Sequence, residues 1–118
     1  MTPRMSIVIP AHDEGPLVRR SLEQMLRGAA PGEFEVVVVA NGCSDDTAEQ
    51  ARAVIGVTVH EIAEGSKIAA LNAGDAHARV LPRAYVDADV ALTVSALRAM
   101  ADELTATTAP LATAPRLI

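Results

Sequence analysis

Two aspartates close an apolar run near residue 90, and their type and spacing suit a metal site. Asp87 and Asp89 stand in "RAYVDADV", where we expect extended backbone, so that both side chains point to one face while Ala88 points away. Two carboxylates about 4 Å apart repel by roughly 4 kcal/mol at an effective dielectric of about 20. A divalent cation relieves that repulsion, and carboxylate oxygens suit Mg²⁺ or Mn²⁺. The plainer alternative is a solvated strand end.

The elements that must position these acids alternate along the chain. The residue pattern predicts strands at 4–10, 34–40, 57–62 and 83–89, helices at 15–29, 45–55, 66–79 and 95–104, and a short fifth strand within 111–118. The run "FEVVVVA" is typical of an interior parallel strand, and the more polar "VTVHEI" fits a sheet edge. Strict alternation predicts an α/β fold, a three-layer αβα sandwich with a mainly parallel sheet, as one domain over 1–118.

Local signals refine these helices. Ser44 is expected to cap the second helix, with Asp45 and Asp46 complementing its dipole, and Thr93 or Ser95 to open the fourth. The first helix should bury one apolar stripe. That stripe comprises Leu17, Val18, Leu22, Met25 and Leu26.

Composition excludes several classes of protein. Half of the 118 residues are apolar, which suffices for a core, and a net charge of −5 with scattered basic residues argues against a nucleic-acid partner. Cys43 is the single cysteine, so an internal disulfide and a thiolate-rich metal site are excluded. No apolar run is long enough for a transmembrane segment. We therefore expect a cytoplasmic protein, with peripheral attachment to the inner face of the membrane left open.

Polar residues follow the ends of several predicted strands. Glu14 follows the first strand with Asp13, Asn41 ends the second, and Asp87 with Asp89 ends the fourth. In an open parallel sheet, ligands bind outside the carboxyl ends of the strands. These side chains are therefore expected to gather at one rim of the sheet.

Four segments together resemble the N-terminal half of the family 2 glycosyltransferases, which have the GT-A fold. The segments are "SIVIPAHDEGPLVRRSLEQML", "FEVVVVANGCSDDTAEQA", "EGSKIAALNAG" and "AYVDADV", in the family's order and at its usual intervals. The resemblance implies a sheet order 3-2-1-4 and a nucleotide-diphospho-sugar donor bound through Mn²⁺ or Mg²⁺. The implied site residues are Pro10, Ala11, His12, Glu14, Asn41, Asp45, Lys67, Asp87, Ala88 and Asp89.

The resemblance also implies roles for several of these residues. Glu14 matches an acid that contacts the nucleoside, and Asn41 and Asp45 match positions near the base. Lys67 matches a basic residue before "ALNAG", and Asp87 and Asp89 match the family's Asp-x-Asp metal motif. Simpler interpretations stay open: Glu14 and Asp45 as helix-start residues, Asn41 within a tight turn, and Lys67 as a solvated lysine.

Two departures from the family pattern limit what is implied. "ANG" replaces a frequent Asp-Asp-Gly, and the sequence ends at Ile118 before the segment that would supply the catalytic base and the acceptor surface. We therefore expect a truncated donor half, with the base and the acceptor unknown, an inverting reaction, and self-association as a homodimer or larger assembly.

Three alternatives come from other classes. A nucleotidyltransferase would carry a glycine-rich basic loop after the first strand, where this chain has "AHDEGP". A receiver-type phosphoacceptor would need a lone aspartate after the third strand and a lysine after the fifth, and the chain has neither. A non-catalytic nucleotide-binding or assembly module remains open.

Overall fold

The computed structural model describes residues 2–106 and 112–113, which alternate strictly between strand and helix. The strands are β1 (Met5–Ala11), β2 (Phe34–Asn41), β3 (Val57–Ile62), β4 (Arg83–Tyr85) and β5 (Ala112–Thr113). The helices are α1 (Gly15–Leu26), α2 (Thr47–Arg52), α3 (Lys67–His77) and α4 (Val94–Ala106). The α/β class predicted from the sequence is confirmed.

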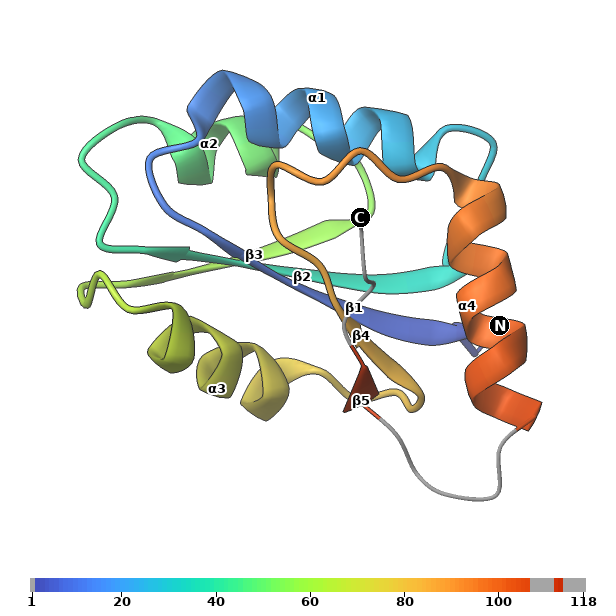
Figure 1. Ribbon diagram of the computed structural model, residues 1–118. Coiled ribbons are helices and arrows are strands. Elements are labelled where there is room, and N and C mark those ends of the chain that lie inside the picture. Colours follow the sequence, from blue (N-terminus) through green and yellow to red (C-terminus); the bar gives the residue numbers. More distant parts are fainter. Residues whose placement is uncertain (1, 107–111, 114–118) are drawn as a thin grey trace.

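All five strands form one parallel sheet in the order β3-β2-β1-β4-β5. The predicted order 3-2-1-4 is therefore confirmed, and β3 lies at an edge as its polar sequence indicated. In Figure 1, α1 and α2 cover one face of the sheet and α3 covers the other, which gives three layers. A receiver-type module, whose sheet order would be 2-1-3-4-5, is excluded by this topology.

Alternate residues of the central strands supply two separate cores. Ile7 and Val38 belong to the larger core, beneath α1 and α4. Val8 and Val39 belong to the smaller core, which includes Ala70 of α3. Both faces of β1 and β2 are thus buried, as their continuous apolar sequence predicted.

Helix α3 packs very closely on the sheet because it carries a glycine at the contact. A Cβ atom on Gly74 would lie 2.2 Å from Cγ1 of Val8, so only glycine permits this approach. The helix begins after Ser66, whose Oγ accepts a hydrogen bond from the Ala69 amide at 3.1 Å. This close seat fixes Lys67, the first residue of α3, beside the carboxyl ends of β1 and β2.

Several predicted boundaries were wrong. The helices predicted at 15–29 and 45–55 are shorter, because α1 ends at Leu26 and α2 covers only Thr47–Arg52. Ser44 does not cap α2, since its amide and hydroxyl both donate to the Asp13 carboxylate. Thr93 does open α4, with its Oγ1 accepting from the Ala96 amide. Of the predicted α1 stripe, Leu17 is exposed.

The prediction that β4 extends to residue 89 was also wrong. The strand ends at Tyr85, and the Val90 amide donates to the Asp87 carbonyl at 3.0 Å. Asp87 and Asp89 therefore stand on a turn and not on extended backbone. Ala88 between them is buried and both acids are exposed, so the two carboxylates still face away from the core. Of the predicted fifth strand, residues 111 and 114–118 lie outside the described part of the chain.

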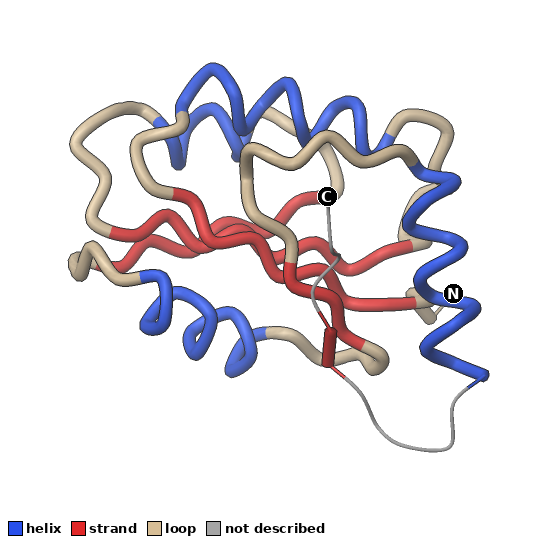
Figure 2. Tube along the Cα trace, viewed as in Figure 1, coloured by secondary structure: helices blue, strands red, loops and turns tan. Residues whose placement is uncertain are grey.

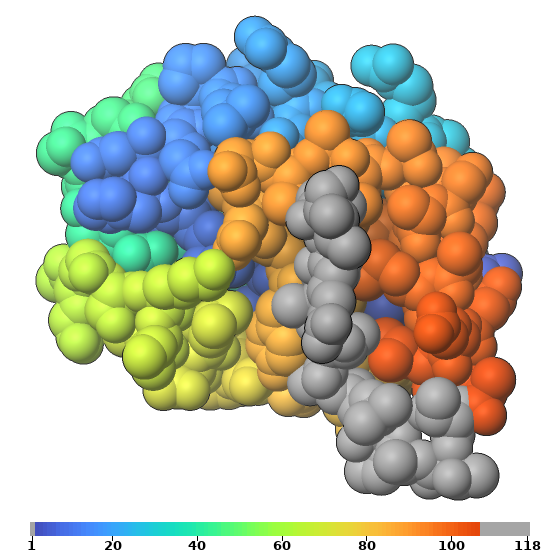
Figure 3. Space-filling view, in the orientation of Figure 1, coloured from blue at the N-terminus to red at the C-terminus, as the bar shows by residue number. Residues whose placement is uncertain are grey.

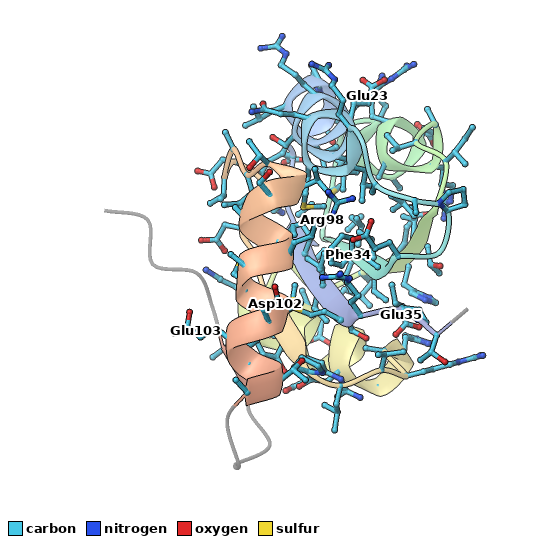
Figure 4. The ribbon with its side chains drawn as sticks, turned by 90° about the vertical axis from the view of Figure 1, so that its right-hand side faces the viewer. Glu23, Phe34, Glu35, Arg98, Asp102 and Glu103 are labelled. Atoms are coloured by element: carbon cyan, nitrogen blue, oxygen red, sulfur yellow. The ribbon has the colours of Figure 1, made fainter. Side chains whose placement is uncertain are left out.

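At the amino ends of the strands, a buried carboxylate is fully compensated. Glu33 receives two bonds from the Arg98 guanidinium, at 2.8 and 2.9 Å, and one from the Ala30 amide. Arg4 adds a contact at 3.5 Å. Figure 4 shows Arg98 reaching from α4 toward the start of β2 at Phe34. These partners lower the pKa of Glu33 to about 2, the Arg98 hydrogen bonds contributing most.

Candidate functional site

A hollow of about 250 Å³ opens at the carboxyl ends of the central strands. Figure 2 shows the loops that follow β1 and β2 gathered at this end of the sheet. The residues that line the hollow are Pro10, His12, Glu14, Asn41, Lys67, Asp87, Ala88 and Asp89. The structure thus brings together eight of the ten residues that the sequence suggested. In Figure 3 the blue, yellow-green and orange surfaces of these segments adjoin on one face.

The loop after β1 turns its side chains into the hollow. The Glu14 carboxylate accepts a hydrogen bond from the His12 amide at 3.1 Å and makes no capping bond to α1, although Glu14 is the N-cap residue. The Glu14 amide donates to Oγ1 of Thr47 at 2.9 Å. The interpretation of Glu14 as a simple helix cap is therefore unsupported, because its carboxylate is directed elsewhere.

The electrostatics of the hollow are those of acids lacking sufficient counter-charge. Burial raises the pKa of Glu14, and the nearby carboxylates of Asp89 and Asp87 raise it further. The hydrogen bond from the His12 amide opposes these effects without cancelling them. A divalent cation would reverse the repulsion among the three carboxylates.

Asn41 is held rigidly at the end of β2. It is buried, and its Nδ2 donates to the Ala11 carbonyl at 2.9 Å. Nδ1 of His12 lies 2.6 Å from the Asn41 carbonyl, so the neutral imidazole carries its proton on Nδ1. Gly42 follows with φ of 56°, and a Cβ there would lie 2.6 Å from Cα of Gly65. The tight turn is therefore real, and it sets Asn41 and His12 together at the wall of the hollow.

Two of the suggested residues do not line the hollow. Ala11 is buried in β1 and offers its carbonyl to Asn41. The Asp45 carboxylate accepts hydrogen bonds from the Gly15 amide at 3.2 Å and from both the amide and the hydroxyl of Thr47. These bonds lower the pKa of Asp45, the Thr47 hydroxyl contributing most. Asp45 thus ties the start of α1 to the start of α2, which argues against direct ligand contact.

Lys67 supplies a positive charge on the opposite wall. Its Nζ lies 2.7 Å from Oδ1 of Asp87, and both side chains are largely exposed. Among the described residues that line the hollow, Lys67 is the only lysine or arginine. The pairing with Asp87 argues against the interpretation of Lys67 as a merely solvated lysine.

A second cluster of metal-binding residue types lies beside the hollow. Ligand atoms of Asp13, Cys43 and Asp45 lie within 4.8 Å of one another, the one such group of three in the described part of the chain. Asp13 is already bonded to the Ser44 amide at 2.7 Å, and a thiol is a poor ligand for Mg²⁺ or Mn²⁺. This cluster therefore holds loops together, whereas Asp87 and Asp89 offer exposed carboxylates suited to a hard divalent cation.

Sequence reasoning missed Thr47, a buried residue on which the geometry of the site depends. Its hydroxyl both accepts from the Glu14 amide and donates to Asp45. A threonine two residues after an aspartate is a common local turn pattern, so that signal was available. The longer link to Glu14 spans 33 positions and had no local signal.

The chain belongs to the Glycosyl transferase family 2, whose sequence model matches residues 6–116. The match confirms the resemblance drawn from the four segments and favours the glycosyltransferase interpretation over a nucleotidyltransferase. No curated protein sequence matches the chain significantly.

Solved structures agree with this family and add a ligand. The chain is similar to the mannosyltransferase PcManGT from Pyrobaculum calidifontis in complex with GDP-Man and Mn²⁺, with 26% identity and a TM-score of 0.77 over 92% of this chain and 34% of that one. Two structures of S. aureus TarS share the fold, with TM-scores of 0.66 and 0.65 at 21% and 23% identity, over 89% of this chain. The chain spans 32% and 20% of the length of those two.

The chain thus corresponds to about a third or less of each matched structure. Within residues 2–106 and 112–113, no helix has both the length and the apolar character needed to cross a bilayer.

Proposed function

We propose that this chain binds a nucleotide-diphospho-sugar through Mn²⁺ or Mg²⁺ and forms the donor-binding domain, over residues 1–118, of an inverting sugar transferase. The convergence of eight suggested residues on one hollow carries this proposal. Membership of the Glycosyl transferase family 2 and the similarity to a mannosyltransferase in complex with GDP-Man and Mn²⁺ support it. The hollow is small beside the sites that enclose whole drug-sized ligands, so it would receive only part of the donor.

The two walls of the hollow would take different parts of the donor. His12, Glu14 and Asn41 form the wall at the ends of β1 and β2, where the nucleoside would lie. Lys67, Asp87 and Asp89 form the charged wall, where the diphosphate would lie with its cation. Asp87 and Asp89 would hold that cation. We leave Asp45 out of direct contact, because its carboxylate is engaged with Thr47 and Gly15.

A transfer of this kind needs a stabilised leaving group and a base that deprotonates the acceptor hydroxyl. A bound divalent cation would supply the positive charge that stabilises the departing diphosphate. The carboxylates of the hollow are assigned here to the donor and its cation, so we expect the base and the acceptor surface outside it. The single cysteine favours a reducing compartment, and we propose a cytoplasmic location, including the inner membrane surface.

Calorimetric titration of GDP-mannose, UDP-glucose and UDP-N-acetylglucosamine, each with Mn²⁺ and with EDTA, tests the proposal. We expect at least one donor to bind with Mn²⁺ and to lose its binding in EDTA. Binding that ignores the metal, or no binding of any donor, would contradict the proposal. Release of free sugar in the same samples would separate an active enzyme from a non-catalytic binding or assembly module.

We also propose that the chain self-associates. Strand β3 is the outer strand of the described sheet, and three large apolar side chains, Ile55, Ile68 and Leu81, are mostly exposed. Unpaired strand edges and exposed apolar groups favour association. Sedimentation velocity should show a dimer or larger species, and a concentration-independent monomer would refute this expectation.

A further inference from the structure

Lys67 and Asp87 form an ion pair across the hollow that the proposed function does not by itself explain. Lys67 is the first residue of α3, and Asp87 begins the turn after β4. Their charged atoms lie 2.7 Å apart. The pair therefore joins two separate segments at the place where the diphosphate and its cation would lie.

This ion pair is short but weakly held. The side chains of Lys67 and Asp87 are 62% and 51% exposed, and exposed pairs contribute at most about 1 kcal/mol. A lysine carries its charge on a flexible four-carbon stem, so the ammonium can move without a change in the backbone. A divalent cation, with twice the charge, is a stronger partner for Asp87 than the ammonium.

The surroundings of Lys67 favour an anion once Asp87 is released. The first turn of α3 holds no acidic residue, so the positive end of the helix dipole is uncompensated there. No other lysine or arginine lines the described hollow. A released Lys67 would therefore be the chain's own cation for the diphosphate in this hollow.

We propose that Lys67 is an exchangeable counter-ion: it neutralises Asp87 while the hollow is empty and transfers to the donor diphosphate when a divalent cation takes Asp87. This inference rests on the proposed function and adds an order of events to it. Lys67 opposes the binding of the cation alone and favours the binding of nucleotide together with cation. The two effects of one residue thus have opposite signs.

The test compares Lys67→Met with the unaltered chain in two titrations. Mn²⁺ alone is titrated by following the electron paramagnetic resonance signal of the free ion, and GDP and UDP are then titrated calorimetrically at saturating Mn²⁺. The variant should bind Mn²⁺ about threefold more tightly, since it lacks the competing pair. It should bind the preferred nucleotide roughly tenfold more weakly, since it lacks a charge-assisted contact.

Arg52→Met is the matched control, because it removes the same charge from an exposed pair with Glu61 that lies outside the hollow. Its Mn²⁺ and nucleotide affinities should stay within about twofold of the unaltered chain. Unchanged or weaker Mn²⁺ binding by Lys67→Met would overturn the exchange, even where the unaltered chain binds Mn²⁺ and nucleotide normally. An unaltered chain that binds no Mn²⁺ would instead overturn the proposed function, and this inference with it.

Discussion

Carboxylates gather at both ends of the central strands, and their surroundings are opposite. At the amino ends, Glu33 is buried but receives the forked guanidinium of Arg98, a backbone amide and a contact from Arg4. At the carboxyl ends, Glu14 is partly buried near two further acids. The pKa of Glu33 is lowered to about 2, whereas the pKa of Glu14 is raised.

This contrast separates a charge that serves the fold from charges available to a ligand. A buried carboxylate is tolerated when hydrogen bonds and a cation compensate it. The acids of the hollow lack that compensation within the described chain, apart from the single pair of Lys67 with Asp87. Perturbed acids in a cleft are candidates for function, and the four predictions below test whether the two ends differ in this way.

The largest effect is expected from Asp89→Asn. The variant loses one of the two proposed cation ligands, so Mn²⁺-dependent nucleotide affinity should fall by about 100-fold or more, because even the outer partners of metal ligands are worth about 10–100-fold. The free energy of unfolding should hardly change. Asp102→Asn at the amino end, where Asp102 makes only an exposed pair with Arg4, is the control. Equal losses in both variants would erase the distinction between the ends.

Arg98→Met should have the opposite profile. It leaves the buried Glu33 carboxylate without its main partner, which should lower the free energy of unfolding by about 2–3 kcal/mol. Arg19→Met, which removes only an exposed helical pair with Glu23, should cost under about 0.5 kcal/mol. Urea denaturation measures both. Unchanged stability in Arg98→Met would show that Glu33 is not compensated as described.

Stability at acid pH should report the same pair. Because the pKa of Glu33 is lowered from 4.5 to about 2, its contribution is complete above 4.5 and is lost as the pH falls toward 2. In Arg98→Met the contribution shrinks, so the unaltered chain and the variant should converge in stability as the pH falls. Denaturation curves recorded through this range check the convergence, and a constant difference would refute the assignment.

The smallest effect is expected from Glu14→Gln, and its sign is the informative part. A raised pKa means that Glu14 favours the fold below its ordinary value of 4.5 and that this contribution is lost as the pH rises through the raised value. The variant should therefore be more stable at neutral pH, by less than about 1 kcal/mol, and the gain should vanish below 4.5. A loss of stability at neutral pH would mean that the carboxylate is compensated after all.

Much of the fold could be predicted because it depends on local pattern. The apolar run of β2 indicated an interior strand, and the polar sequence of β3 indicated an edge. Ser66 signalled the start of α3. The order of the strands came from the family resemblance and not from periodicity, since pairing partners such as Ser6 and Arg83 are far apart in the sequence.

The details of the site depended on contacts between distant residues. Asp45 was expected at the ligand, but Thr47 and Gly15 take its oxygens. The end of β4 at Tyr85 moved both metal-motif acids onto a turn, because their local spacing cannot distinguish a strand from a turn that also buries Ala88. The Glu33–Arg98 pair joins residues 65 positions apart and had no signal in the sequence.

The most direct test of the central claim is anomalous diffraction from crystals grown with Mn²⁺ and GDP. The account predicts one manganese peak within coordination distance of the carboxylates of Asp87 and Asp89, with the diphosphate on its far side and Lys67 turned toward it. A peak at Asp13, Cys43 and Asp45 instead, or nucleotide bound in the hollow without any manganese peak, would contradict it.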